Sequence, residues 1–286
     1  MLVLIGLIIV FASVIGGYLM VNGSMAVLLQ PAELVVIIGA CFGSIVIGSP
    51  FKLLKLVIDQ TPVVLKGSPY NRSAFSELLK MQYEVFINVK KSGWLALEGD
   101  ILTPTSSPIF TKYPFFLHNH HALDFFCAAA TLLVNGAAHP EEIELAMDTE
   151  LETHHEENAI APGILNKAAD SLPGLGIVAA VLGIVVTMQH IDGEPAVIGH
   201  HVAAALVGTF LGLLLSYGMV SPLATCIEKI AHDEAKYLQC IRAGLIAFAN
   251  GAAPGTAVEF ARRTVFSFDR PPGIELEKQL REIKPR

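Results

Sequence analysis

Lysine and arginine are missing from two long regions of this 286-residue chain. All 19 of these basic residues fall within residues 52–167 and 229–286. The regions without them contain four apolar runs: Leu2–Val21, Leu34–Gly48, Leu172–Met188 and Val202–Val220. A helix of about 20 apolar residues spans the bilayer core, and roughly 17 are tolerated. The pattern therefore predicts four transmembrane helices, which confines much of the fold to a lipid bilayer.

The basic residues also predict an orientation. The connections inside each pair of runs, residues 22–31 and 189–201, carry no lysine or arginine. Because basic residues mark cytoplasmic loops, both short loops should face outward and both basic regions should face the cytoplasm. We therefore predict two transmembrane hairpins in a multi-pass protein with both termini in the cytoplasm. No cleavable signal peptide is expected, because no basic segment precedes the first run.

The region between the hairpins has helical periodicity. Apolar residues recur at helical spacing in Ala74–Val89, and Leu123–Val134 is apolar enough for a core helix that Gly136 stops. Pro140 should begin a third helix, acidic on one face and apolar on the other. No strand pattern of useful length occurs, so the predicted fold class is all-α.

Four segments follow from these assignments: a transmembrane hairpin at 1–50, a helical cytoplasmic domain at 51–170, a second hairpin at 171–222 and a helical cytoplasmic segment at 223–286. Asp170 or Ser171 should cap the third span, with Pro173 in its first turn. Pro222 should bend one long helix that continues from the fourth span, because proline removes a helical hydrogen bond.

Several kinds of function find no support in the sequence. The net charge of −7 gives no sign of nucleic-acid binding. There is no G-x-S-x-G nucleophile elbow and no phosphate loop, so we expect neither an enzyme nor a cofactor. The four cysteines have no paired spacing, which predicts neither disulfides nor a zinc site.

Five of the histidines are candidate metal ligands by their clustering. They cluster in two places: His118, His120 and His121, and His154–His155. No helical His-x-x-x-His pair and no nearby cysteine supports coordination. We therefore expect no metal site.

Small residues form stripes on the third and fourth spans. Gly208 and Gly212 continue such a stripe on the fourth span, and Gly176 lies on the third. In lipid, small residues let a neighbouring helix approach closely. The neighbour can be another helix of the same chain or a helix of a second chain, and the sequence leaves both open.

No charged residue lies inside a predicted span. Glu33 lies at the outer end of the second and Asp170 at the inner end of the third. Intramembrane charges cost about 2.5–3.5 kcal/mol on insertion scales and are kept mainly for function. If the chain conducts ions, a partner should supply the carboxylate. Thr209 is the main polar side chain near mid-span, although a lone threonine commonly bonds to its own helix.

Seven segments together resemble the MotA family of flagellar stator proteins. They cover nearly the whole chain with matching spacing: Gly16–Met20, Gln30–Leu34, Asp170–Pro173, Gly176–Ala180, Val207–Gly212, Ser221–Ala224 and Ala257–Thr264. The resemblance implies a ring of five chains in the bacterial inner membrane around two helices of a MotB-type partner. That partner supplies the missing carboxylate and anchors to peptidoglycan. Ion flow turns the ring, whose cytoplasmic domains push on the rotor protein FliG.

The resemblance also implies roles for single residues. Glu98 matches an acidic rotor-contact position, and Lys90 lies where the family commonly has arginine. The alternative for both is an exposed charge of little energetic consequence. Five residues match family positions that line the ion pathway or couple it to cytoplasmic movement: Asp170, Pro173, Ala180, Thr209 and Pro222.

The coupling ion is predicted from two positions. Sodium-driven relatives place threonines where this chain has Ala180 and Gly208. Alkali cations need oxygen ligands when they lose water. Neither position offers a side-chain oxygen, so we expect protons.

The rival functions are an energiser of the TolQ or ExbB type, a self-contained transporter, a membrane enzyme and a structural scaffold. TolQ and ExbB chains usually have three spans, whereas this chain has four. A transporter would show an intramembrane charge or inverted repeats. The sequence favours the stator.

Overall fold

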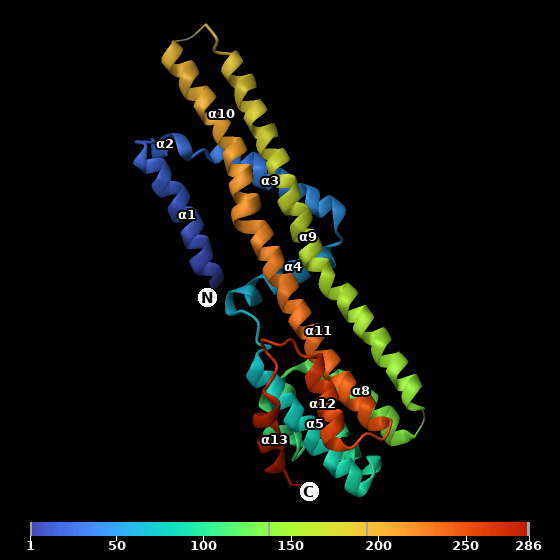
Figure 1. Cartoon of the computed structure of the whole chain (residues 1–286). Coiled ribbons are helices and arrows are strands. Elements are labelled where there is room, and N and C mark those ends of the chain that lie inside the picture. The colour runs from blue at the N-terminus through green and yellow to red at the C-terminus, as the bar shows by residue number, and fades with distance from the viewer. Residues whose placement is uncertain (1, 137, 193, 285–286) are drawn as a thin grey trace. The chain divides into compact units, whose positions relative to one another are not determined.

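The computed structural model describes residues 2–136, 138–192 and 194–284 (Figure 1). Helices dominate this part of the chain, and no β-strand occurs in it, which confirms the all-α prediction. Met1 and Arg286 lie outside the described residues, so the predicted side of each terminus stays a prediction.

The chain divides into two compact units, each built from two separate stretches. Unit 1 comprises Met1–Gly67 and Asn158–Lys229, and unit 2 comprises Ser68–Glu157 and Ile230–Arg286. The long helices α9 and α11 contribute residues to both units. The four predicted segments, with boundaries at residues 50, 170 and 222, stay a prediction.

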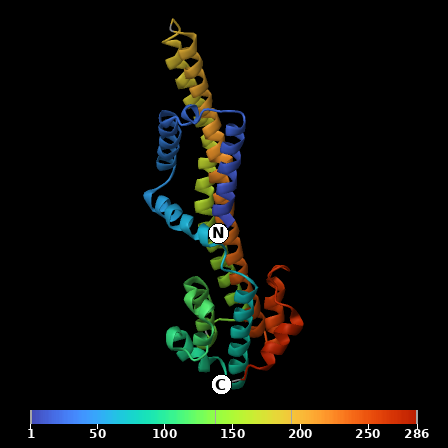
Figure 2. The ribbon, with the colours of Figure 1, turned by 90° about the vertical axis from the view of Figure 1, so that its left-hand side faces the viewer.

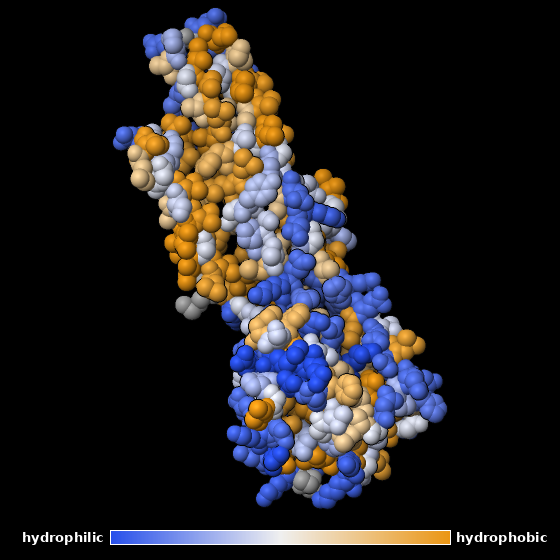
Figure 3. Space-filling model, viewed as in Figure 1, coloured by the Kyte–Doolittle hydropathy of each residue, from blue (hydrophilic) through white to orange (hydrophobic). Residues whose placement is uncertain are grey.

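Unit 1 holds the apolar helices. Its elements, with those shared with unit 2, are α1 (Leu2–Met20), α2 (Met25–Leu28), α3 (Pro31–Gly48), α4 (Phe51–Lys66), α9 (Pro140–Met188), α10 (Pro195–Leu215), the π-helical segment η4 (Ser216–Val220) and α11 (Ser221–Ala249). Four helical stretches in the described residues are long and apolar enough to cross a membrane, which agrees with the predicted spans. Figure 3 shows mostly hydrophobic side chains over the face formed by α1 and α10.

Two predicted helix starts are wrong. α9 runs without interruption through Asp170 and Ser171, so neither residue caps a helix, and Pro173 lies inside α9. α10 begins at Pro195 rather than near Val202, because proline is compatible with the first helical turn. Helix α4 is an element that the sequence pattern did not predict.

Unit 2 is built from helices around one hydrophobic core. Its remaining elements are α5 (Arg72–Ser92), η1 (Trp94–Leu97), α6 (Glu98–Leu102), η2 (Pro104–Ser106), η3 (Phe110–Lys112), α7 (Pro114–His118), α8 (His120–Asn135), α12 (Pro254–Thr264) and α13 (Gly273–Arg281). The predicted stop at Gly136 is confirmed, because α8 ends there in the left-handed region with φ 59°. In the same way, α5 ends before Gly93. Such a backbone favours glycine.

Aromatic rings fill the interior of unit 2. Phe86 of α5 stacks on Phe248 of α11 with ring centroids 4.5 Å apart. Tyr237 of α11 is fully buried, and its ring lies 5.6 Å from that of Phe75. Offset aromatic pairs contribute beyond the area they bury. These contacts fix α5 against α11 and give the exposed parts of unit 2 a rigid support.

Candidate functional site

Helices α9 and α10 approach each other through glycines. A Cβ atom placed on Gly212 would lie 2.6 Å from the carbonyl oxygen of Leu172 and 2.9 Å from the Cα atom of Gly176. A Cβ atom on Gly176 would lie 2.8 Å from the carbonyl oxygen of Gly208. The neighbours are backbone atoms that no rotamer change can move. This face therefore packs α9 on α10 within one chain, as both ribbon views show (Figures 1 and 2).

Two of the five pathway candidates, Ala180 and Thr209, lie at the same contact. Ala180 of α9 is buried, and its backbone nitrogen would be 3.2 Å from a Cβ atom on Gly208. The Cα atom of Thr209 would lie 3.3 Å from a Cβ atom on Gly176. The fold thus brings Ala180 and Thr209 together with the three packing glycines, although they come from two helices about 30 residues apart in sequence.

Glu33 reaches this helix pair from α3. It occupies the first turn of α3, where a carboxylate interacts favourably with the helix dipole. Its Oε2 atom would be 2.5 Å from a Cβ atom on Gly208, and its Oε1 atom 3.3 Å from one on Gly183. Oε2 is buried with no hydrogen-bond partner among the described residues. From sequence Glu33 is only a helix-end residue, but its carboxyl group lies against α9 and α10.

A serine compensates for the proline inside α9. Proline at position 173 has no N–H, so it cannot donate to the carbonyl of Ala169 four residues earlier. The buried hydroxyl of Ser216 donates to that carbonyl at 2.7 Å. Ser216 opens the π-helical segment η4 of the facing helix. Pro173 is therefore tolerated in a continuous helix because the neighbouring helix supplies the missing donor.

This pairing predicts a coupled effect of two substitutions. We expect Ser216→Ala to destabilise the chain by about 1–2 kcal/mol, because it leaves the Ala169 carbonyl unpaired. In a Pro173→Ala background, the restored N–H should satisfy that carbonyl, and the same change should cost much less. Thermal unfolding of the four purified chains in detergent measures the difference. Equal costs in both backgrounds would contradict the pairing.

The other two pathway candidates are exposed. Pro222 is the second residue of α11, and α11 follows directly on η4. A π-helical turn is a common accommodation where a helical ladder is interrupted, so the fourth span continues into α11 as one helix, as predicted. Asp170 also lies on the surface of its unit. The structure does not bring Asp170 or Pro222 into the glycine contact.

Lys90 and Glu98 lie exposed on unit 2. Lys90 is in the last turn of α5, and Glu98 begins α6. Neither forms an ion pair within the described part of the chain. Exposed charges without a partner contribute little to stability, so the fold of unit 2 does not depend on Lys90 or Glu98.

The surroundings of Glu98 are apolar and rigidly held. Leu95 and Leu102 on either side of it are 69% and 73% exposed. Beneath them Leu97 is buried, and the buried Ser107 hydroxyl donates to Asp100 at 2.7 Å. A charge flanked by exposed leucines on a fixed support is a surface suited to contact with another protein.

The fold and these sites define a polytopic membrane protein with a close-packed helix pair, a carboxyl group at that pair and a charged helical unit. Residues 4–93 match the family described as motility protein A N-terminal, and residues 118–239 match the MotA/TolQ/ExbB proton channel family. The chain belongs to the motility protein A (MotA) family.

Individual relatives agree with this assignment. Motility protein A of Escherichia coli is 41% identical over 284 residues, covering 99% of this chain and 96% of the relative. Chemotaxis protein LafT of Vibrio parahaemolyticus is 34% identical, covering 97% and 98%.

Solved structures share the fold. The MotAB structure from C. jejuni has a TM-score of 0.79 at 19% identity, covering 94% of this chain and 98% of that one. The flagellar MotAB stator complex from Bacillus subtilis has a TM-score of 0.74 at 24% identity, covering 96% and 98%.

Proposed function

We propose that this chain is a flagellar motor stator subunit that conducts protons and converts their flow into torque. The observation that carries the proposal is the likeness to Motility protein A along nearly the whole chain, at 41% identity. The close-packed pair α9–α10 with Glu33 beside Gly208 supports a role in ion movement. The exposed charges of unit 2 support a role in contacting a rotor.

The proposal includes partners and location. The chain lies in the bacterial inner membrane with both termini in the cytoplasm. Five copies surround two transmembrane helices of a MotB-type subunit anchored to peptidoglycan, and unit 2 contacts FliG. The solved neighbours are described as MotAB complexes, which supports the MotB-type partner. The proposal includes neither catalysis nor a cofactor besides the coupling ion.

Deletion of the gene tests this function. The deletion strain should build filaments of normal number and length but should not turn them, and expression of the intact chain should restore rotation. Paralysed cells with normal filaments would support a stator. Cells that swim normally but show envelope defects would instead favour an energiser of the TolQ or ExbB type. The four apolar stretches and the motility relatives favour the stator.

The coupling ion is expected to be the proton. Neither Gly208 nor Ala180 carries a side-chain oxygen, so neither position supplies the ligand that dehydrated sodium needs. Rotation of tethered cells should continue at full speed without sodium and should stop with a protonophore. A rotation rate that follows external sodium would contradict the prediction.

Reversal of the charge at Glu98 should weaken torque. Glu98→Lys alters an exposed residue beside Leu95 and Leu102, so folding and membrane insertion should not change. We expect at least a several-fold loss of swimming speed under viscous load, because like charges across a contact repel. Glu152→Lys, an exposed acid on α9, is the control. Equal torque in wild type and Glu98→Lys would remove Glu98 from the rotor contact.

A further inference from the structure

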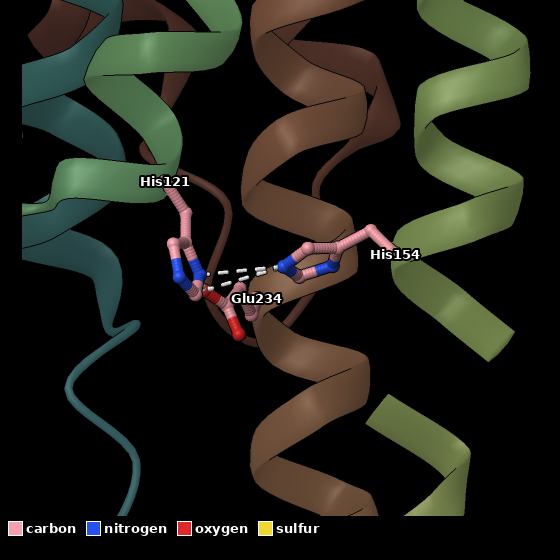
Figure 4. Close-up of side chains that lie close together, drawn as sticks. All are labelled: His121, His154 and Glu234. Carbon is pink, nitrogen blue, oxygen red and sulfur yellow. Dashed lines mark hydrogen bonds and ion pairs between the residues drawn. The ribbon is translucent and has the colours of Figure 1, made fainter. Parts of the chain in front are cut away.

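Three side chains of unit 2 come together from three different helices. His121 belongs to α8, His154 to α9 and Glu234 to α11 (Figure 4). The possible ligand atoms, one from each side chain, all lie within 4.8 Å of one another. No sequence pattern predicts this cluster, because His121, His154 and Glu234 are far apart in the chain.

The three ligand atoms are close enough to one another to share one metal ion. His121 Nδ1 lies 3.1 Å from Glu234 Oε1 and 3.4 Å from His154 Nε2, and the latter two atoms are 3.9 Å apart. Of the three contacts, only the 3.9 Å separation of His154 Nε2 from Glu234 Oε1 is too long for a hydrogen bond. The point equidistant from the three atoms lies about 2.0 Å from each, which is the usual zinc–nitrogen and zinc–oxygen bond length.

We propose that His121, His154 and Glu234 form a binding site for a divalent transition-metal ion, most simply Zn²⁺. Two histidines and one carboxylate are a known zinc ligand set that leaves a fourth position for water or another ligand. The bound ion links α8, α9 and α11 and so stabilises unit 2.

The surroundings favour a cation. The Tyr70 hydroxyl interacts with the Glu234 carboxylate. A hydroxyl that bonds to a ligating carboxylate orients it. Two more acids lie nearby: Glu150 is close enough to interact electrostatically with both His154 and Asp124. The side chain of His121 is 66% exposed, which leaves a path for an ion from solvent.

Zinc titration tests the site. The full-length chain, purified in detergent with a tag that contains no histidine, should bind one Zn²⁺ per chain in isothermal titration calorimetry. His121→Ala and His154→Ala should each weaken binding at least about 100-fold, since loss of mere supporting residues costs 10–100-fold. The adjacent exposed residues His120 and His155 provide matched controls, and their alanine variants should bind Zn²⁺ as tightly as the wild type.

Two further measurements keep the test independent of folding. Glu234→Gln preserves the shape of the side chain but removes its charge, and it should also weaken binding. Saturating Zn²⁺ should raise the melting temperature of the wild type and of both controls, but not that of the ligand variants. Absence of stoichiometric binding, or equal binding by ligand variants and controls, would overturn the proposal.

Discussion

Replacement of Gly212 by leucine should abolish the working motor. The Cβ atom of the new side chain would lie 2.6 Å from the Leu172 carbonyl oxygen and 2.9 Å from the Gly176 Cα atom. The leucine would therefore have to displace backbone atoms of α9. Overpacking usually costs about 1–3 kcal/mol, and here the cost should reach or exceed the upper end because the neighbours are backbone atoms. Separation of α9 from α10 would also disturb Ala180, Thr209 and Glu33. We expect complete loss of swimming and little complex with the MotB-type partner.

The control for Gly212→Leu is Gly199→Leu. Gly199 lies on the same helix, but a Cβ atom there would meet nothing within 4 Å. Both variants should be produced in a deletion strain, with the amount of chain in the membrane measured beside co-purification of the partner. Normal complexes and normal swimming with Gly212→Leu would show that α9 and α10 do not need this close approach.

Replacement of Glu84 by alanine should destabilise unit 2 by about 2–3 kcal/mol. The Glu84 side chain is only 4% exposed, and its carboxylate accepts from Lys112 Nζ at 2.5 Å and from the Tyr113 hydroxyl at 2.7 Å. Burial and the bond to Glu84 both raise the pKa of Tyr113. Alanine would leave that buried hydroxyl without its acceptor, which accounts for most of the cost. Lys112 is 58% exposed and can turn to water, so its ion pair contributes less.

Thermal unfolding in detergent measures this effect. A loss of 2–3 kcal/mol should lower the melting temperature by roughly 5–10 °C in a chain of this size. Glu84→Gln keeps an oxygen acceptor for Tyr113 and should lower it less, whereas Glu152→Ala removes an exposed acid and should leave it unchanged. Equal melting temperatures for Glu84→Ala and Glu152→Ala would show that the buried carboxylate does not support the fold.

The apolar runs and the helix stops were readable because each depends on residues close in sequence. Length and hydropathy alone predict a helix such as α1, and Gly93 or Gly136 ends a helix through its own backbone freedom. The start of α9 at Pro140 followed from the same kind of local rule. The family resemblance then identified positions such as Thr209 and Glu98, although their roles remain predictions.

Local rules failed where a distant residue decided the outcome. Asp170 and Pro173 form a convincing helix start in sequence, but the Ser216 hydroxyl, 47 residues from Ala169, satisfies the carbonyl that Pro173 cannot. The helix therefore continues. Glu33 likewise appeared to be a helix-end residue until α3 placed its carboxyl group at Gly208.

The sequence by itself determined which segments enter the membrane, which faces are small enough for close packing, and the family. These properties follow from hydropathy, from side-chain size and from motif spacing, all of which can be read directly from the sequence. Only the tertiary structure decided what the glycines of α10 pack against, which donor compensates for Pro173, and that His121, His154 and Glu234 meet. Each of these depends on how separate helices pack together. The residues involved are far apart in the chain, so no local sequence pattern shows that they meet.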